Sequence, residues 1–142
     1  MKVYIKKNNE LSSTFNQFLN IQENSADYRR FVAEEYQQQS YTVWEYSKDR
    51  DFSTNNQLNL ILKKKSIIIL VQCKNDNANI GMDEINSFKA QSKQFIQENK
   101  IFENYNIKLR YAMSGLFLKE DAYRYIQNHP DEIDYNIIKM KS

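Results

Sequence analysis

The clearest hydrophobic pattern in the chain is a run of five aliphatic residues at 67–71, Ile-Ile-Ile-Leu-Val. An uninterrupted apolar run rich in β-branched residues is typical of a strand covered on both faces of a sheet. The polar run 63–65 separates it from a second apolar segment at 57–62, and this arrangement predicts a β-hairpin. We therefore expect a central pair of strands at 57–62 and 66–74.

Three other segments have the apolar spacing of amphipathic helices, and we expect helices at 25–39, 82–98 and 119–128. The first begins at Ser25, a favourable N-cap residue, and the last ends before Pro130. The residues predicted to lie on the buried faces of these helices are Tyr28, Phe31, Val32, Tyr36, Ile85, Phe88, Phe95, Ile96, Ala122, Tyr125 and Ile126.

Further strands are expected at 41–46, 107–113 and 135–140, where β-branched and aromatic residues are frequent. The order along the chain is helix, three strands, helix, strand, helix, strand. This alternation predicts an α/β fold in which a mixed β-sheet is flanked by helices on both faces.

A chain of 142 residues with 41% apolar residues is long and hydrophobic enough for one domain with one core. We assign that domain to residues 25–142 and regard residues 1–24 as an N-terminal extension. The extension contains a possible short strand at 2–6 and a weakly amphipathic helix at 11–21. Only two glycines and one proline are present, which argues against a turn-rich β-sandwich.

The formal net charge of +2 does not by itself indicate a nucleic-acid-binding protein. Phosphate contacts would have to come from local clusters such as residues 63–65 or residues 29–30. Cys73 is the single cysteine, which excludes an internal disulfide and a cysteine-based zinc site. The longest apolar run is too short to cross a bilayer, and the charged N-terminus lacks a signal-peptide core. We expect an intracellular protein, cytoplasmic or nuclear and not secreted, without a membrane partner.

The residues with the clearest chemical interest end the central strand. Alternate residues of a strand share a face, so Gln72 and Lys74 point to one side and Cys73 to the other. Polar side chains at the end of an apolar central strand are costly to bury without partners, so their placement suggests a function. Asn59 lies on the preceding strand, and a hairpin register would bring it beside Gln72 and Lys74.

Several segments resemble the Mrr-type (type IV) restriction endonuclease domain of the PD-(D/E)xK nuclease superfamily, over about residues 26–140. Residues 40–43, Ser-Tyr-Thr-Val, stand where the family has Gly-Tyr-x-Val, and residues 58–61, Leu-Asn-Leu-Ile, where it has Ile-Asp-Leu-Ile. Residues 71–74 are identical to the family's Val-Gln-Cys-Lys, with Gln72 thirteen residues after position 59. Two later segments, 113–115 and 119–122, resemble the family's closing strand and helix. The resemblance implies a restriction-endonuclease-like fold.

The resemblance also implies roles for three residues. In the family, the aspartate and the residue before x-Lys help to hold a divalent metal, and the lysine acts near the attacked phosphate. These positions are Asn59, Gln72 and Lys74 here. Asn59 is neutral where the family has a carboxylate, and Arg29 falls near the place of a helical glutamate in many relatives. Because Mg²⁺ usually needs one or two carboxylates, the resemblance implies a weakened metal site that still binds phosphate through Lys74 and Arg29.

Three functions remain open at this stage. The first, and the leading hypothesis, is a pseudo-nuclease: a DNA-binding module without a cofactor, acting as an accessory subunit of a DNA-processing or DNA-modifying complex. The second is an active Mg²⁺-dependent endonuclease in which Gln72 and a relocated carboxylate hold the metal. The third is a protein-interaction scaffold that does not bind DNA. The candidates for the relocated carboxylate are Glu34, Glu35, Asp49 and Asp51.

Each candidate residue also has an ordinary structural explanation. Gln72 and Lys74 could simply end a strand at the surface, and Asn59 could be a strand residue that faces a loop. The three lysines Lys63, Lys64 and Lys65 are candidates for DNA contacts, but a solvated hairpin turn is the favoured explanation for them. Whether Asn59 is the native residue or an engineered inactivation is also left open.

Overall fold

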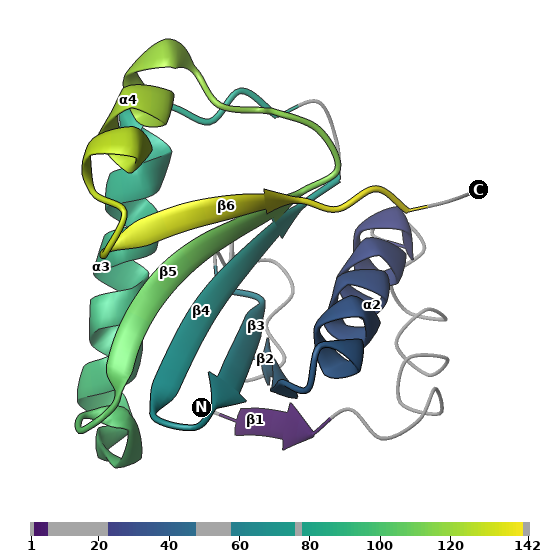
Figure 1. The fold of residues 1–142 in the computed structure, drawn as a ribbon, viewed down its shortest axis with the longest axis vertical. Coiled ribbons are helices and arrows are strands. Elements are labelled where there is room, and N and C mark those ends of the chain that lie inside the picture. The colour runs from purple at the N-terminus through teal and green to yellow at the C-terminus, as the bar shows by residue number, and fades with distance from the viewer. Residues whose placement is uncertain (1, 6–22, 48–57, 76–77, 141–142) are drawn as a thin grey trace.

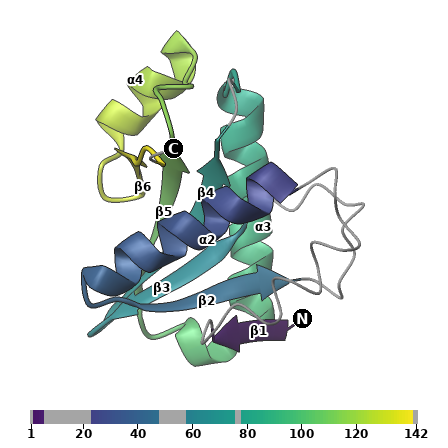
Figure 2. The ribbon, with the colours of Figure 1, turned by 90° about the vertical axis from the view of Figure 1, so that its right-hand side faces the viewer.

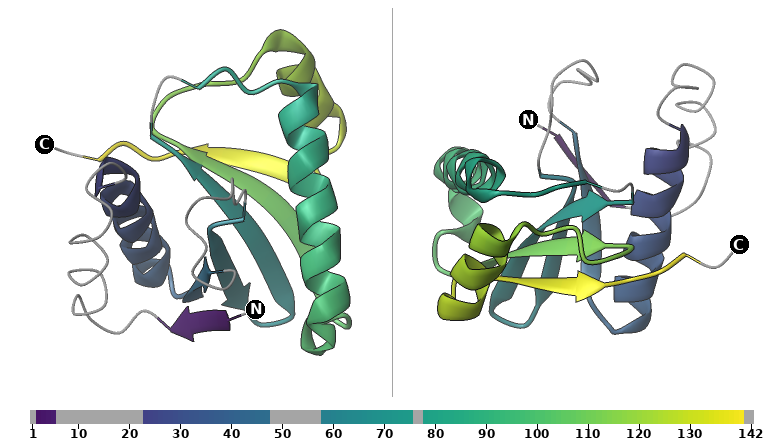
Figure 3. Two further views of the ribbon diagram at one scale, coloured as in Figure 1. Left: turned by 180° about the vertical axis from the view of Figure 1, so that it is seen from behind. Right: turned by 90° about the horizontal axis from the view of Figure 1, so that it is seen from above.

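The computed structural model describes residues 2–5, 23–47, 58–75 and 78–140. These residues form a six-stranded mixed sheet with one helix on one face and two helices on the other (Figures 1 and 3). The predicted α/β class, with a mixed sheet flanked by helices on both faces, is therefore confirmed. None of the helices described here is both long enough and apolar enough to cross a membrane.

The elements have the following bounds. The strands are β1 (Lys2–Ile5), β2 (Thr42–Ser47), β3 (Leu60–Lys64), β4 (Ile67–Lys74), β5 (Asn106–Met113) and β6 (Ile133–Ile137). The α-helices are α2 (Glu23–Gln38), α3 (Met82–Glu98) and α4 (Glu120–Asn128), and a short 3-10 helix, η2 (Lys100–Phe102), follows α3.

The strands lie in the sheet in chain order, from β1 to β6. The first four pair antiparallel, whereas β4–β5 and β5–β6 are parallel pairs. A parallel pair needs a crossover connection, and α3 and α4 supply the two crossovers. Both crossovers move in the same direction along the sheet, so the preference for right-handed connections places both helices on the same face. The remaining helix, α2, lies across the opposite face, as Figure 2 shows.

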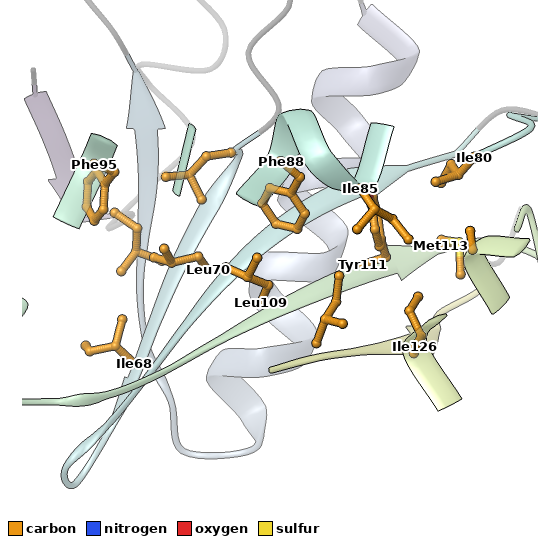
Figure 4. Close-up of a cluster of buried hydrophobic side chains, with 14 residues drawn as sticks. Ile68, Leu70, Ile80, Ile85, Phe88, Phe95, Leu109, Tyr111, Met113 and Ile126 are labelled. Atoms are coloured by element: carbon orange, nitrogen blue, oxygen red, sulfur yellow. The ribbon is translucent and has the colours of Figure 1, made fainter. Parts of the chain in front are cut away.

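Two hydrophobic clusters form the core, one on each face of the sheet, and β4 contributes to both. Its even-numbered residues Ile68 and Leu70 belong to the cluster under α3 and α4, which Figure 4 shows in close-up. Its odd-numbered residues Ile69 and Val71 belong to the cluster under α2. Burial on both faces explains why the sequence of β4 is apolar without alternation.

The strand β3 begins and ends later than the expected range of 57–62. Lys63 and Lys64 pair with Ile68 and Ile67, so two of the three consecutive lysines belong to the strand and the turn is shorter than predicted. Lys65 takes up the sharp turn with a φ of 57°. The physical reason is that the apolar residues of β4 extend to Ile67, and the antiparallel ladder continues as far as partners are available.

Three other predictions about the elements need correction. The strand β6 lies at Ile133–Ile137 rather than 135–140, because Ile133 is buried and pairs with Leu109 of β5. The helix α2 begins before Ser25, and its buried face uses Ala33 while Phe31 is only half-buried. The expected strand at 2–6 is present as β1, and it pairs with β2, so this part of the extension belongs to the sheet.

Ser40, in the turn that follows α2, has an unusual backbone conformation. Its φ is 75°, in the left-handed region that glycine adopts at least cost. Hydrogen bonds from Ser40 N–H to the Gln37 carbonyl and from Tyr41 N–H to the Tyr36 carbonyl close the last turn.

Candidate functional site

Asn59 lies directly before β3 and bonds to both neighbouring strands. Its N–H donates to the carbonyl oxygen of Val71 (2.8 Å), and its own carbonyl oxygen accepts a hydrogen bond from β2. Its side-chain Oδ1 accepts the N–H of Cys73 at 2.7 Å. Because Cys73 stands between Gln72 and Lys74, the structure brings Asn59 against the end of β4, as the hairpin pattern predicts.

The hydrogen bond from Cys73 also gives Asn59 a structural role. The backbone carbonyl of Asn59 accepts a hydrogen bond from β2. Its side-chain oxygen, in place of the backbone carbonyl, therefore accepts the N–H of Cys73 in β4. An aspartate oxygen would accept the same bond. The arrangement is therefore compatible with either residue at position 59, and only the charge of the site differs between them.

Gln72 faces the α3 side of the sheet, on the same side as Ile68 and Leu70. It is only 4% exposed, so the alternative explanation that it ends a strand at the surface is wrong. Its Oε1 is buried and has no hydrogen-bond partner among the residues that the structure describes. Leaving such a group unsatisfied costs about 1–3 kcal/mol, which calls for an explanation.

Lys74 ends β4 on the same side as Gln72 and is half-buried. Within the described part of the chain, its ammonium group forms no ion pair and no side-chain hydrogen bond. A lysine ammonium is a compact charge with three donors, which suits a phosphate oxygen.

One residue beside Gln72, Tyr111, was missed by the sequence analysis. Tyr111 is the Cα partner of Gln72 across the parallel pair β4–β5, and its hydroxyl is also buried without a partner in the described structure. Its ring packs against Phe88 with 5.2 Å between the ring centroids. Burial raises the pKa of Tyr111, and the negative charge of Glu84 in the first turn of α3 raises it further. The helix α3 that carries Glu84 covers this face of the sheet.

The predicted lysine cluster does not join Lys74. Residues 63–65 lie at the opposite end of β4, about 23 Å away at 3.3 Å per residue. Lys64 Nζ donates to the carbonyl oxygen of Gln39 (2.8 Å) and lies 4.7 Å from the ring centroid of Tyr41. Lys63 lies over the ring of Tyr105. These cations belong to the packing of the hairpin and cannot contact the same phosphate as Lys74.

Arg29 is also separated from Lys74. It lies on α2, which packs on the sheet face that Val71 and Cys73 contact, whereas Gln72 and Lys74 face the other side. The predicted pairing of Arg29 and Lys74 around one phosphate is therefore not supported by their placement.

Two of the four candidate relocated acids lie on this same helix, on the face of the sheet away from Gln72. Glu34 is exposed and Glu35 is half-buried. Asp49 and Asp51 lie outside the described residues. Among the residues that are described, no group of three or more His, Cys, Asp or Glu side chains is arranged to hold a metal.

A second polar cluster lies on the α2 side of β5 and β6. Arg110 donates two hydrogen bonds to Asp134, at 2.7 and 3.0 Å, and Lys108 approaches the same carboxylate at 3.1 Å. Burial alone would raise the pKa of Asp134, but the bonds and charges of Arg110 and Lys108 outweigh it and hold that pKa below its ordinary value. Nearby, the Tyr36 hydroxyl donates to Asn136 Oδ1 at 2.6 Å. This cluster is fully bonded and ties β6 to β5 and α2.

Comparison of the chain with protein-family models, with curated proteins and with solved structures finds no match in any of the three. The functional interpretation therefore rests on the motifs and on the geometry described above.

Proposed function

We propose that the protein is a DNA-binding module with a nuclease-like fold whose cleavage site is weakened or inactive. One observation carries the proposal. The neutral side chain of Asn59 accepts the N–H of Cys73, which stands between Gln72 and Lys74, and the Lys74 ammonium has no anionic partner in the described structure. A carboxylate at position 59 would attract a cation, and it would compete with a phosphate for the Lys74 ammonium. With an amide there, the end of β4 favours an anion, and the backbone phosphate of DNA is the anion that the family resemblance suggests.

The proposal implies modest affinity for DNA by the isolated chain. The net charge is only +2, and the lysines of the β3–β4 hairpin are far from Lys74. The hairpin lysines would at most contact a different phosphate. A partner subunit that also binds DNA would raise the effective concentration of this module at the duplex. We therefore propose an accessory role in an intracellular DNA-processing or DNA-modifying complex.

Salt-dependent retention on duplex DNA tests the binding proposal. We expect the protein to be retained at low salt and released as salt rises, because each phosphate contact releases counterions. Lys74→Ala should elute at lower salt and reduce the slope of log K against log salt by about one contact, or about 0.9. Lys100→Ala, at an exposed lysine of η2, is the control and should behave like the wild type.

Two outcomes would contradict the binding proposal. Absence of retention at low salt would favour the protein-interaction scaffold. Equal elution of the Lys74 and Lys100 variants would show that Lys74 contacts no phosphate.

Plasmid cleavage in Mg²⁺ tests the second part of the proposal. The wild-type protein should cut slowly or not at all, and Asn59→Asp, which keeps the oxygen that accepts the Cys73 N–H, should cut faster. Robust cleavage by the wild type that Lys74→Ala abolishes would instead establish an active Mg²⁺-dependent endonuclease. For this second candidate, Asp83 and Glu84 in the first turn of α3 are carboxylates of the helix that covers the face to which Gln72 points.

A further inference from the structure

The strand β6 is an edge of the sheet among the residues that the structure describes. It pairs with β5 on one side, and no described strand pairs with its other side, where Figure 3 (right) shows it as the last strand. An open edge presents backbone N–H and C=O groups that can pair with another chain. Many edge strands carry a lysine or a proline that hinders such pairing, and β6 contains neither.

The ladder with β5 decides which backbone groups of β6 are open. The carbonyl oxygen of Glu132 accepts the N–H of Leu109, and the N–H of Ile138 donates to the carbonyl oxygen of Met113. The even-numbered residues of this segment therefore bond to β5. Because the backbone groups of successive residues in a strand point to opposite sides, the odd-numbered residues direct theirs to the open edge, with Tyr135 at the centre.

The sequence of β6 is nearly symmetric about its central residue. Its five residues are Ile-Asp-Tyr-Asn-Ile, so an antiparallel pair of two copies centred on Tyr135 sets similar side chains opposite one another. Ile137 faces the partner's Ile133, and Asp134 faces the partner's Asn136, so no like charges are opposed. The central pair is a hydrogen-bonded one, as the direction of the open backbone groups requires. A strand that matches itself in reverse is suited to a two-fold interface.

Side chains around β6 favour the same occupant. Ile137 is 42% exposed although it lies in the sheet, and Tyr123 of α4 is 37% exposed, with its ring centroid 6.4 Å from that of Tyr135. Beyond the strand ends, the same register sets Lys139 opposite the partner's Asp131, which are exposed and oppositely charged. We propose that the open edge of β6 binds β6 of a second copy of this chain, antiparallel about Tyr135, so that the two sheets become continuous.

The dimer should be weak and reversible. The N–H of Ile133 donates within its own chain, to the carbonyl oxygen of His129, so Tyr135 and Ile137 supply the inter-chain backbone donors. A pair of five-residue strands buries less than the roughly 1,200 Å² of a stable complex, and we expect a dissociation constant on the order of 10⁻⁵–10⁻⁴ M. The proposal goes beyond DNA binding, because it requires neither a phosphate nor Lys74.

Analytical ultracentrifugation of the full chain without DNA, from about 1 μM to about 1 mM, tests the proposal. We expect a monomer–dimer equilibrium. Ile137→Lys places a charge at the edge of each copy and should weaken dimerisation about tenfold or more. Ile67→Lys is the matched control: it adds the same charge at a strand residue of similar exposure (44%) away from β6, and should change the dissociation constant less than about twofold. A monomer at every concentration, or equal effects of the two substitutions, would overturn the proposal.

A cross-link tests the register independently of any loss of stability in Ile137→Lys. Tyr135 would lie on the two-fold axis, where hydrogen-bonded antiparallel partners have Cα atoms about 5.5 Å apart, within the range of a disulfide. In a Cys73→Ser background, mild oxidation should link Tyr135→Cys into dimers about tenfold faster than Tyr123→Cys, which lies on α4 away from the axis. Equal rates of dimer formation in the two variants would overturn the proposal.

Discussion

The polar side chains on the two faces of the sheet differ in whether they have hydrogen-bond partners. On the α2 side, Arg110 and Lys108 share the carboxylate of Asp134, and Tyr36 donates to Asn136. Every polar group that this cluster uses is matched by a partner. Such a network holds the edge strand β6 against its neighbour and against α2, and it needs no function beyond stability.

On the α3 side, the polar groups of Gln72 and Tyr111 are buried without partners in the described structure. Stability alone would favour Leu or Phe at these positions, because an unsatisfied buried group costs about 1–3 kcal/mol. The contrast shows which polar cluster stabilises the fold and which one reduces its stability. Polar residues that reduce stability are stronger candidates for function, and here they lie beside Lys74 and Asn59.

Breaking the bonded cluster should have the largest effect. Arg110→Ala removes both hydrogen bonds to Asp134 and leaves that carboxylate partly buried. We expect a loss of about 2–4 kcal/mol in the free energy of unfolding, somewhat less than for a fully buried pair because Asp134 is 28% exposed. Urea denaturation measures it. Arg124→Ala, in the exposed pair with Glu120, should change stability by less than about 0.5 kcal/mol, and a similar loss in both variants would contradict this expectation.

The same Tyr→Phe substitution should affect stability differently on the two faces of the sheet. Tyr36→Phe removes a bonded hydroxyl and should destabilise the protein by about 1 kcal/mol. Tyr111→Phe removes an unpartnered buried hydroxyl and should leave stability unchanged or raise it by about 1 kcal/mol. Thermal and urea unfolding of the pair would measure the difference. A loss of stability in Tyr111→Phe as large as in Tyr36→Phe would mean that the Tyr111 hydroxyl is bonded in solution.

Acid should also weaken the bonded cluster around Asp134, and we expect this effect to be smaller than those of the substitutions. The folded pKa of Asp134 is lower than its unfolded value of about 4, so its contribution is present above that pH. The contribution is lost as pH falls through the unfolded pKa toward the folded one, because the unfolded chain then binds the extra proton. Urea midpoints at pH 6 and pH 3 should therefore fall more in the wild type than in Asp134→Asn. An equal fall in both would remove Asp134 as a cause of acid sensitivity.

Much of the central sheet follows directly from local patterns. The apolar run at Ile67–Val71 predicted a strand buried on both faces, and the hairpin with the preceding segment is present with Asn59 against the end of β4. Both results depend on contacts between segments close in sequence, where a short turn leaves few possible registers. The predicted helix at 82–98 was exact because its apolar spacing extends over many turns.

The neighbours of Gln72 could not be predicted in this way. Tyr111 reaches it only through the parallel register of β4 and β5, which the long α3 crossover sets. Local spacing says nothing about such a register, because a crossover of this length permits several alignments.

The sequence by itself determined the α/β class, the buried central strand and the pairing of Asn59 with the end of that strand, because periodicity and a short hairpin specify them locally. Tertiary structure alone decided that Arg29 and the hairpin lysines lie away from Lys74, and that Tyr111 lies beside Gln72. These placements depend on which face each helix covers and on how far each strand extends, and both are set by packing between segments distant in the chain.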